Sequence, residues 1–232
     1  MNRSLRLLLV SSVSMRRSAK ILGVNHKTVA RRIGYLASKA REDLAKHPAP
    51  APSCPELYLD ELITFEHTRC KPLAVAMVVS RERKILTFRV SSMPPIGKNL
   101  RKISFRKYGR RHDHRKKGIR ACLNDVRPYV RRGSRFVSDR DPSYGELIQR
   151  IYPGIEHRTH PSKRAVIAGL GELKDHSFDP LFAINHTFAM LRANLSRLVR
   201  RTWATTKKVS RLHDFLNIYA AFHNLELTPL PS

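Results

Sequence analysis

The sequence predicts an α/β protein, in which a mixed sheet flanked by helices follows a small all-α domain. Three observations predict this fold: helical spacing of apolar residues at the start, short β-branched apolar runs in the middle, and long amphipathic segments at the end. With 232 residues, of which 41% are hydrophobic, the chain can bury a core and form two domains. We expect a helical domain over 1–45, a linker over 46–55, the α/β domain over 56–225 and a tail over 226–232.

The first 45 residues have the layout of a helix-turn-helix. Ser14 can cap a helix that reaches Leu22, Gly23 permits the positive φ of a tight turn, and a second helix begins near His26 and reaches about Arg41. A helix-turn-helix places its second helix in the major groove of DNA. The side chains presented there would be Asn25, His26, Lys27, Thr28, Arg31 and Arg32. The alternative is a cationic three-helix bundle with no role in DNA binding.

After Lys46 and His47, proline and alanine alternate over 48–52. This pattern cannot form a regular helix and favours extended polyproline geometry. We interpret the segment as the linker between the two domains.

The segment after the linker predicts a sheet. Apolar, β-branched runs at 57–65, 73–79 and 85–90 are separated by turn-like breaks and predict an antiparallel meander. A helix reaching Tyr129 is expected next, followed by a strand at 134–138, a helix at 142–151, a strand at 155–157 and amphipathic helices at 179–201 and 209–223. This is the element order of a ribonuclease H-like domain, so we expect a ribonuclease H-like mixed sheet flanked by helices.

The charge of the chain favours an extended polyanion as its partner. Lys and Arg number 45 against 18 Asp and Glu, a formal net charge of +27, and the basic residues are spread along the whole sequence. Nucleic acid is the expected partner. The most basic stretch, 98–117, includes Phe105 and Tyr108, which could stack on bases; the alternative is a solvated charged face.

Two short acidic clusters stand out in so basic a chain. Asp60 and Glu61 end one β-prone run, and Asp139 and Asp141 end another. The first and fourth strands of the predicted sheet are neighbours, so Asp60 and Asp139 can meet. Carboxylates are the ligands that Mg²⁺ prefers, and paired metal ions carry out phosphoryl transfer. The alternative is that each aspartate only caps a turn at a strand end.

The chain also resembles a known family. The motifs that carry the resemblance are Leu59-Asp60-Glu61, Ser138-Asp139 with Pro142 and Tyr144, Leu191-Arg192 with Arg197, and Lys207 with Leu212-His213-Asp214. Together they resemble the catalytic half of an InsAB-type insertion-sequence transposase of the DDE family. The segment from Ala19 to Val29 resembles that family's end-binding module.

This resemblance implies a DNA transposase that cuts element ends and joins them to target DNA with Mg²⁺, or with Mn²⁺ in its place. Asp60 and Asp139 would bind metal, and Arg192 would contact the DNA strand. The partners would be double-stranded DNA and further copies of the chain assembled on it. The rival function is a catalytically inactive DNA-binding protein or regulator derived from such an enzyme.

The third metal ligand is where the resemblance is weakest. The position of the family's glutamate falls on Asn185, which binds metal poorly. Glu172 follows Asp139 at a separation common in DDE enzymes, so the resemblance implies Glu172 as the third catalytic ligand and Asn185 as a polar helper. The alternative for Glu172 is an exposed loop acid.

The remaining features of the sequence concern the cellular compartment and the resemblance to a shortened copy of the family. Cys54, Cys70 and Cys122 are far apart, which argues against a disulfide framework or zinc ribbon and favours a reducing cytoplasm. With the resemblance, this predicts a bacterial-type, nucleoid-associated protein with no membrane partner. Family members commonly carry a zinc ribbon before the helix-turn-helix, and its absence predicts a shortened copy. Trp203 is expected to pack into a domain seam, with DNA contact as the alternative.

Overall fold

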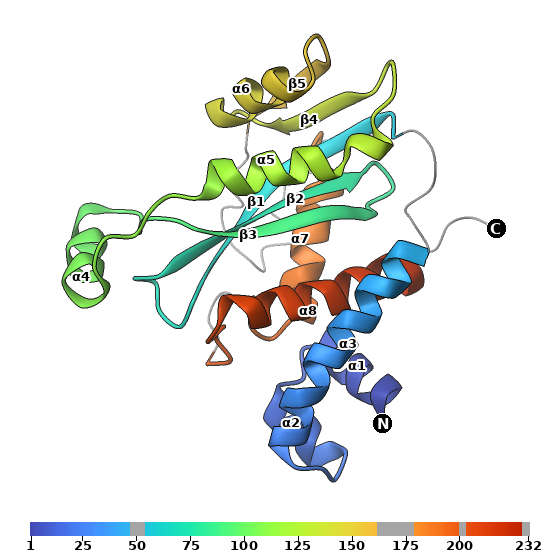
Figure 1. The fold of residues 1–232 in the computed structure, drawn as a ribbon, viewed down its shortest axis with the longest axis vertical. Coiled ribbons are helices and arrows are strands. Elements are labelled where there is room, and N and C mark those ends of the chain that lie inside the picture. The colour runs from blue at the N-terminus through green and yellow to red at the C-terminus, as the bar shows by residue number, and fades with distance from the viewer. Residues whose placement is uncertain (47–53, 162–178, 200–202, 229–232) are drawn as a thin grey trace, which may run out of the picture.

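The computed structural model describes residues 1–46, 54–161, 179–199 and 203–228 (Figure 1). The strands are β1 Glu56–Phe65, β2 Pro72–Ser80, β3 Ile85–Ser92, β4 Arg135–Asp139 and β5 Glu156–His160. The helices are α1 Asn2–Val10, α2 Met15–Ile21, α3 His26–Lys46, α4 Lys98–Tyr108, α5 Arg115–Asp125, α6 Pro142–Ile151, α7 Phe182–Asn194 and α8 Val209–Phe222. Most of the expected linker, 47–53, lies outside the described residues.

The five strands form one mixed sheet in the order β3-β2-β1-β4-β5. The first three pair antiparallel as a meander, and β4 pairs parallel with both β1 and β5. The predicted adjacency of the first and fourth strands is therefore confirmed. The arrangement is consistent with the ribonuclease H-like sheet that the element order predicted.

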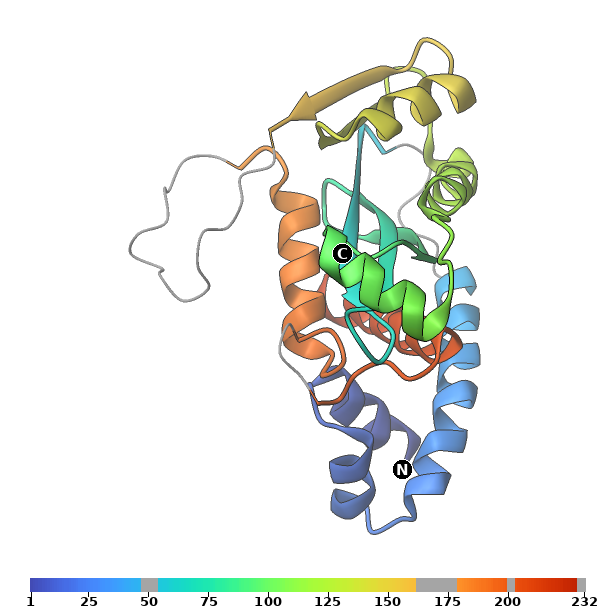
Figure 2. The ribbon, with the colours of Figure 1, turned by 90° about the vertical axis from the view of Figure 1, so that its left-hand side faces the viewer.

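Helices cover both faces of this sheet (Figures 1 and 2). Side chains alternate between the faces along a strand, so neighbouring residues of β1 enter different cores. Leu57 and Leu59 pack with residues of α5 and α6, whereas Tyr58 and Leu62 pack with residues of α7 and α8. Every residue of β2 is buried, which explains why its run is apolar without alternation.

The N-terminal helices lie where the apolar spacing predicts them. Ser14 accepts a hydrogen bond from the backbone N–H of Arg17 at the start of α2, and Gly23 has a φ of 64° after its end. Asn25 caps α3 by accepting from the backbone N–H of Lys27 at 2.8 Å. α3 is longer than expected, because residues beyond Arg41 continue the helix to Lys46.

The N-terminal helices share an apolar core with the rest of the chain. α3 packs along α8 (Figure 1). Leu5, Val29 and Ile33 belong to the same buried cluster as Leu212 and Leu216 of α8. The domain boundaries after residues 45 and 55 stay predictions.

Two helices and one side chain differ from the sequence-based expectation. The basic stretch before α5 contains a helix of its own, α4, which ends at Gly109 with a φ of 74°. The amphipathic segment expected to run to residue 201 stops being helical at Asn194, where Leu195 turns to an extended backbone. Leu195 and Leu198 are buried, so the chain folds back onto the core there. Trp203 is fully exposed, so the expected seam packing is wrong.

In the described part of the chain, none of the helices combines the length and apolar character that crossing a bilayer requires.

Candidate functional site

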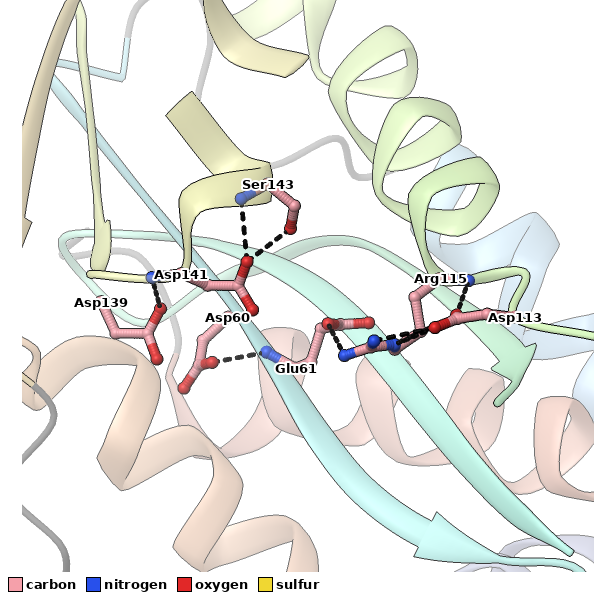
Figure 3. A network of polar contacts seen from close by, with 7 residues as sticks. All are labelled: Asp60, Glu61, Asp113, Arg115, Asp139, Asp141 and Ser143. Atoms are coloured by element: carbon pink, nitrogen blue, oxygen red, sulfur yellow. Dashed lines mark hydrogen bonds and ion pairs between the residues drawn. The ribbon is translucent and has the colours of Figure 1, made fainter. Parts of the chain in front are cut away.

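The sheet brings Asp60 and Asp139 together. The parallel ladder between β1 and β4 ends with the pair Leu59 and Ser138, and each aspartate is the next residue along its strand. Figure 3 shows their carboxylates pointing into the same space. Asp139 ends β4 as expected, but Asp60 lies in the middle of β1, because that strand continues by pairing with β2.

The carboxylate of Asp60 is held in a largely buried position. Burial raises its pKa to about 7, and the neighbouring carboxylate of Asp139 adds to the rise. The backbone N–H of Glu61 donates to Asp60 Oδ1 at 2.6 Å, and Tyr144 and Arg192 also favour its charged form. A cation beside the two aspartates would offset the cost of this buried charge.

The start of α6 orients Asp139. Asp141 is the N-cap of α6 and accepts hydrogen bonds from the backbone N–H of Ser143 at 2.9 Å and from its hydroxyl at 2.6 Å. The backbone N–H of Asp141 in turn donates to Asp139 Oδ1 at 3.0 Å. Helix capping is thus performed by Asp141, which leaves the second oxygen of Asp139 directed toward Asp60 (Figure 3).

Tyr144 is the buried support of this acidic group. Its side chain is 2% exposed, and burial together with the nearby carboxylates raises the pKa of its hydroxyl above the ordinary value. A neutral tyrosine hydroxyl donates to a carboxylate, which is the contact that favours the charged form of Asp60.

A second acidic group lies on the opposite face of β1. Glu61 points toward Arg115 at the start of α5, with 4.0 Å between Oε2 and Nη1, and Asp113 binds the same arginine at 2.8 Å (Figure 3). Only 7% of the Glu61 side chain is exposed, and its Oε1 accepts no hydrogen bond from the described residues. Burial raises the pKa of Glu61 to about 7. Sequence reasoning did not place Glu61 in a site, although the Asp113-x-Arg115 pattern signals a local ion pair.

Arg192 of α7 lies close enough to Asp60 to affect its ionisation. Its positive charge lowers the pKa of Asp60. Arg192 also lines a hollow of about 380 Å³ between β1, the start of α4 and the end of α7. The arginine therefore lies between the two aspartates and an open surface.

The third metal ligand stays a prediction. Asn185 lies on the exposed side of α7, where its amide donates to Asp179 Oδ2 at 3.0 Å. Glu172 lies outside the described residues. Among the described residues, no group of three or more His, Cys, Asp or Glu side chains could hold a metal ion.

The two aspartates nevertheless fit a magnesium ion. Mg²⁺ is commonly bound through one or two carboxylates, with waters and substrate phosphates completing its shell. Asp60 and Asp139 supply two hard oxygen donors from neighbouring strands, and the raised pKa of Asp60 shows that its negative charge is incompletely compensated.

The expected DNA-reading residues gather at the start of α3. Asn25, His26, Lys27 and Arg31 are exposed there, and Thr28 and Arg32 are half-buried. The Arg32 guanidinium lies 5.8 Å from the centre of the Tyr35 ring. The polar end of α3 therefore faces solvent, whereas Ile33 and Leu36 face the core.

Comparisons with known proteins find a distant structural likeness. No protein-family model matches the chain, and no curated protein matches it. Among solved structures, the chain is similar to one described as the crystal structure of the catalytic domain of Mos1 mariner transposase. The identity is 12%, the match covers 83% of this chain and 88% of that chain, and the TM-score is 0.29. A likeness this distant carries no argument about function.

Proposed function

We propose that this chain is a DNA-processing enzyme of the DDE transposase type, which cleaves DNA strands and joins them to a target. The observation that carries the proposal is the adjacency of Asp60 and Asp139 at the end of the β1–β4 ladder in a chain of net charge +27. A half-buried pair of carboxylates in so basic a protein repels a phosphate backbone unless a cation lies between them. The resemblance of the motifs around both aspartates supports the same function.

Asp60 and Asp139 would hold Mg²⁺, or Mn²⁺, and Glu172 is proposed as their third partner. A bound divalent ion would make the attacking oxygen more nucleophilic and stabilise the leaving oxygen. Tyr144 keeps the Asp60 carboxylate oriented, and Arg192 would bind a phosphate of the strand. Water and then a freed 3′ hydroxyl would be the successive nucleophiles.

We further propose that the N-terminal helices bind element ends. The exposed start of α3 would enter the major groove, where Asn25, Lys27 and Arg31 can reach base edges and phosphates. A homo-oligomer on double-stranded DNA is part of this proposal, because two ends must be brought to one target.

Nicking of a supercoiled plasmid in Mg²⁺ or Mn²⁺ tests the enzymatic proposal. Asp60→Asn and Asp139→Asn keep the side-chain shape but remove a metal-binding charge, so each should lower the nicking rate by about 100-fold or more. Asp43→Asn makes the same chemical change on α3, where Asp43 only pairs with Lys39, and should nick like the parent. A parent that never cuts, or aspartate variants that cut at the parent's rate, would contradict the proposal.

One observation favours a second candidate function. Asn185 is engaged with Asp179, and the described residues hold no three-membered ligand group. An incomplete ligand set is what a catalytically inactive DNA-binding protein or regulator derived from a transposase would have. Binding of DNA without cleavage in either metal would select this alternative.

A further inference from the structure

A basic arm leaves the sheet between β3 and α5. This α4 arm, residues 94–112, carries helix α4 away from the sheet and from the other helices (Figure 1). Within α4 only Ser104 is buried, and its hydroxyl donates to the carbonyl of Cys70 at 2.7 Å. The helix is thus held to the body by a narrow contact, and core packing does not account for its composition.

Positive charge lines the outer side of α4. The helix carries Lys98, Arg101, Lys102, Arg106 and Lys107 and no acidic residue. Lys98, Lys102 and Arg106 are spaced four residues apart, so they form one row on the side opposite Ser104. Like charges at this spacing destabilise a helix. A bound polyanion would reverse that cost.

Aromatic and aliphatic side chains border the same row. Phe105 is 65% exposed and follows Lys102 by one turn, and Ile103 is also exposed. The ring of Tyr108 is partly engaged, because the Lys71 ammonium lies 5.6 Å from its centre. An exposed phenylalanine ring beside a row of cations matches the surfaces that bind unpaired nucleic acid, where bases stack on rings and cations follow the backbone.

We propose that the α4 arm binds an unpaired DNA strand. A duplex keeps its bases stacked inside, so it would bind to the cations alone and would offer no base for the exposed Phe105 ring to stack on. The hollow lined by Ile96, Leu100 and Arg192 lies between the arm and the Asp60 carboxylate. A strand lying on the arm would therefore pass toward the aspartate pair. The inference rests on the proposed action on DNA, and its test measures binding alone, so its failure is distinct from a failure of cleavage.

Fluorescence anisotropy of the full chain with labelled oligo(dT) and with a duplex of equal length tests the arm. Phe105→Leu should weaken oligo(dT) binding by about 5-fold or more, since each base stacked on a ring contributes about 1–3 kcal/mol. Duplex binding should not change. Phe182→Leu is the matched control, because Phe182 is 55% exposed on α7. Phe105→Trp retains a ring and should keep the parent's affinity.

The charged row has its own control. For oligo(dT), the slope of log affinity against log salt concentration should become shallower by about 1.4 in the double variant Lys102→Ala with Arg106→Ala. This change corresponds to the loss of two phosphate contacts on a single strand. Arg131→Ala with Arg132→Ala removes the same charge from an exposed turn before β4 and should leave that slope unchanged. All variants should melt at the parent's temperature, because none of the replaced side chains is buried.

Several results would overturn the proposal. One is a loss of oligo(dT) affinity in Phe105→Leu that is no larger than the loss in Phe182→Leu. Another is an equal loss of duplex affinity in Phe105→Leu, which would assign the arm to a duplex backbone. Failure of Phe105→Trp to bind better than Phe105→Leu would exclude stacking. Tighter binding of oligo(rU) than of oligo(dT) would assign the arm to RNA.

Discussion

Asp60 and Asp139 follow the last backbone pair of the β1–β4 ladder side by side, so their carboxylates share one space. Neighbouring parallel strands place consecutive residues at matched heights, and this backbone constraint keeps the two charges together in spite of their repulsion. The relationship implies that the fold carries an electrostatic cost at this point. That cost can be measured apart from any activity.

Asp60→Asn should stabilise the metal-free protein at pH 8. The folded state holds the Asp60 proton more tightly than the unfolded chain, because the pKa is raised from 3.8 to about 7. The contribution of Asp60 to stability is therefore fully present below about pH 4 and is lost as the pH rises through about 7. Removing the charge should raise the free energy of unfolding by about 1–3 kcal/mol at pH 8, measured by urea denaturation in EDTA.

Mg²⁺ should likewise stabilise the parent protein, because the ion would offset the charge of Asp60. An ion bound only by the folded state stabilises it by about 1.4 kcal/mol at ten times its dissociation constant. The melting temperature of the parent should rise with Mg²⁺, whereas that of Asp60→Asn should stay level. Equal Mg²⁺ responses of the two proteins would place the ion elsewhere.

The third ligand can be assigned by comparing two variants. Glu172→Gln should reduce metal-dependent nicking about as much as Asp139→Asn does, because it removes one ligand charge. Asn185→Ala should have a small effect, since the Asn185 amide is bonded to Asp179. The nicking rates of both variants decide between the positions. A defect in Asn185→Ala alone would move the third position onto α7.

The start of α3 should control DNA binding without controlling stability. Arg31→Ala removes an exposed cation and should weaken binding to a cognate end by about 1–3 kcal/mol if it reaches a base edge. Arg41→Ala is the control on the same helix, because Arg41 is also exposed and lies near the far end. Gel-shift titrations compare the two variants. Equal losses of DNA affinity would show that α3 contributes only positive charge and does not recognise bases.

The aspartate pair could be predicted from the sequence for a physical reason. The runs around Asp60 and Asp139 are apolar enough to be buried strands, and the order of strands and helices leaves few ways to arrange them. The neighbouring first and fourth strands then bring the two residues together. The apolar run at 57–65 predicted a strand that continues through Asp60, and β1 confirms it. The expectation that Asp60 ends a strand was wrong, because a charge inside an apolar run looks like the end of a strand.

Other parts of the site depend on tertiary contacts that no local pattern encodes. Glu61 lies near Arg115 only because α5 packs over β2 and β3 on that face of the sheet. Arg197 belongs to a motif that suggested DNA contact, yet its guanidinium lies 3.5 Å from the centre of the Phe215 ring, and burial lowers its pKa to about 10. The end of α7 at Asn194 was missed because the amphipathic pattern continues past it, into buried leucines that are not helical.

A buried histidine predicts how the fold responds to acid. His223 is 1% exposed, and its Nε2 lies 2.8 Å from the carbonyl oxygen of Arg83, so the ring is held neutral between α8 and the turn before β3. Burial lowers its pKa from 6.5 to about 4, and the charges of Arg83, Lys84 and His186 add to the effect. Between about pH 6.5 and 4, the unfolded chain therefore binds a proton at His223 that the folded chain does not bind.

The stability contributed by His223 is thus present above about pH 6.5 and is lost as the pH falls toward 4. We expect this residue to account for about 1–2 kcal/mol of the decrease in unfolding free energy between pH 7.5 and 5.0. His223→Gln keeps a donor for the Arg83 carbonyl but does not titrate, so it should be less stable at pH 7.5 and lose less on acidification. Urea denaturation of both proteins at the two pH values measures the difference. Carboxylates contribute equally to both proteins and cancel, so parallel losses would mean that His223 is protonated in the folded chain as readily as in the unfolded one.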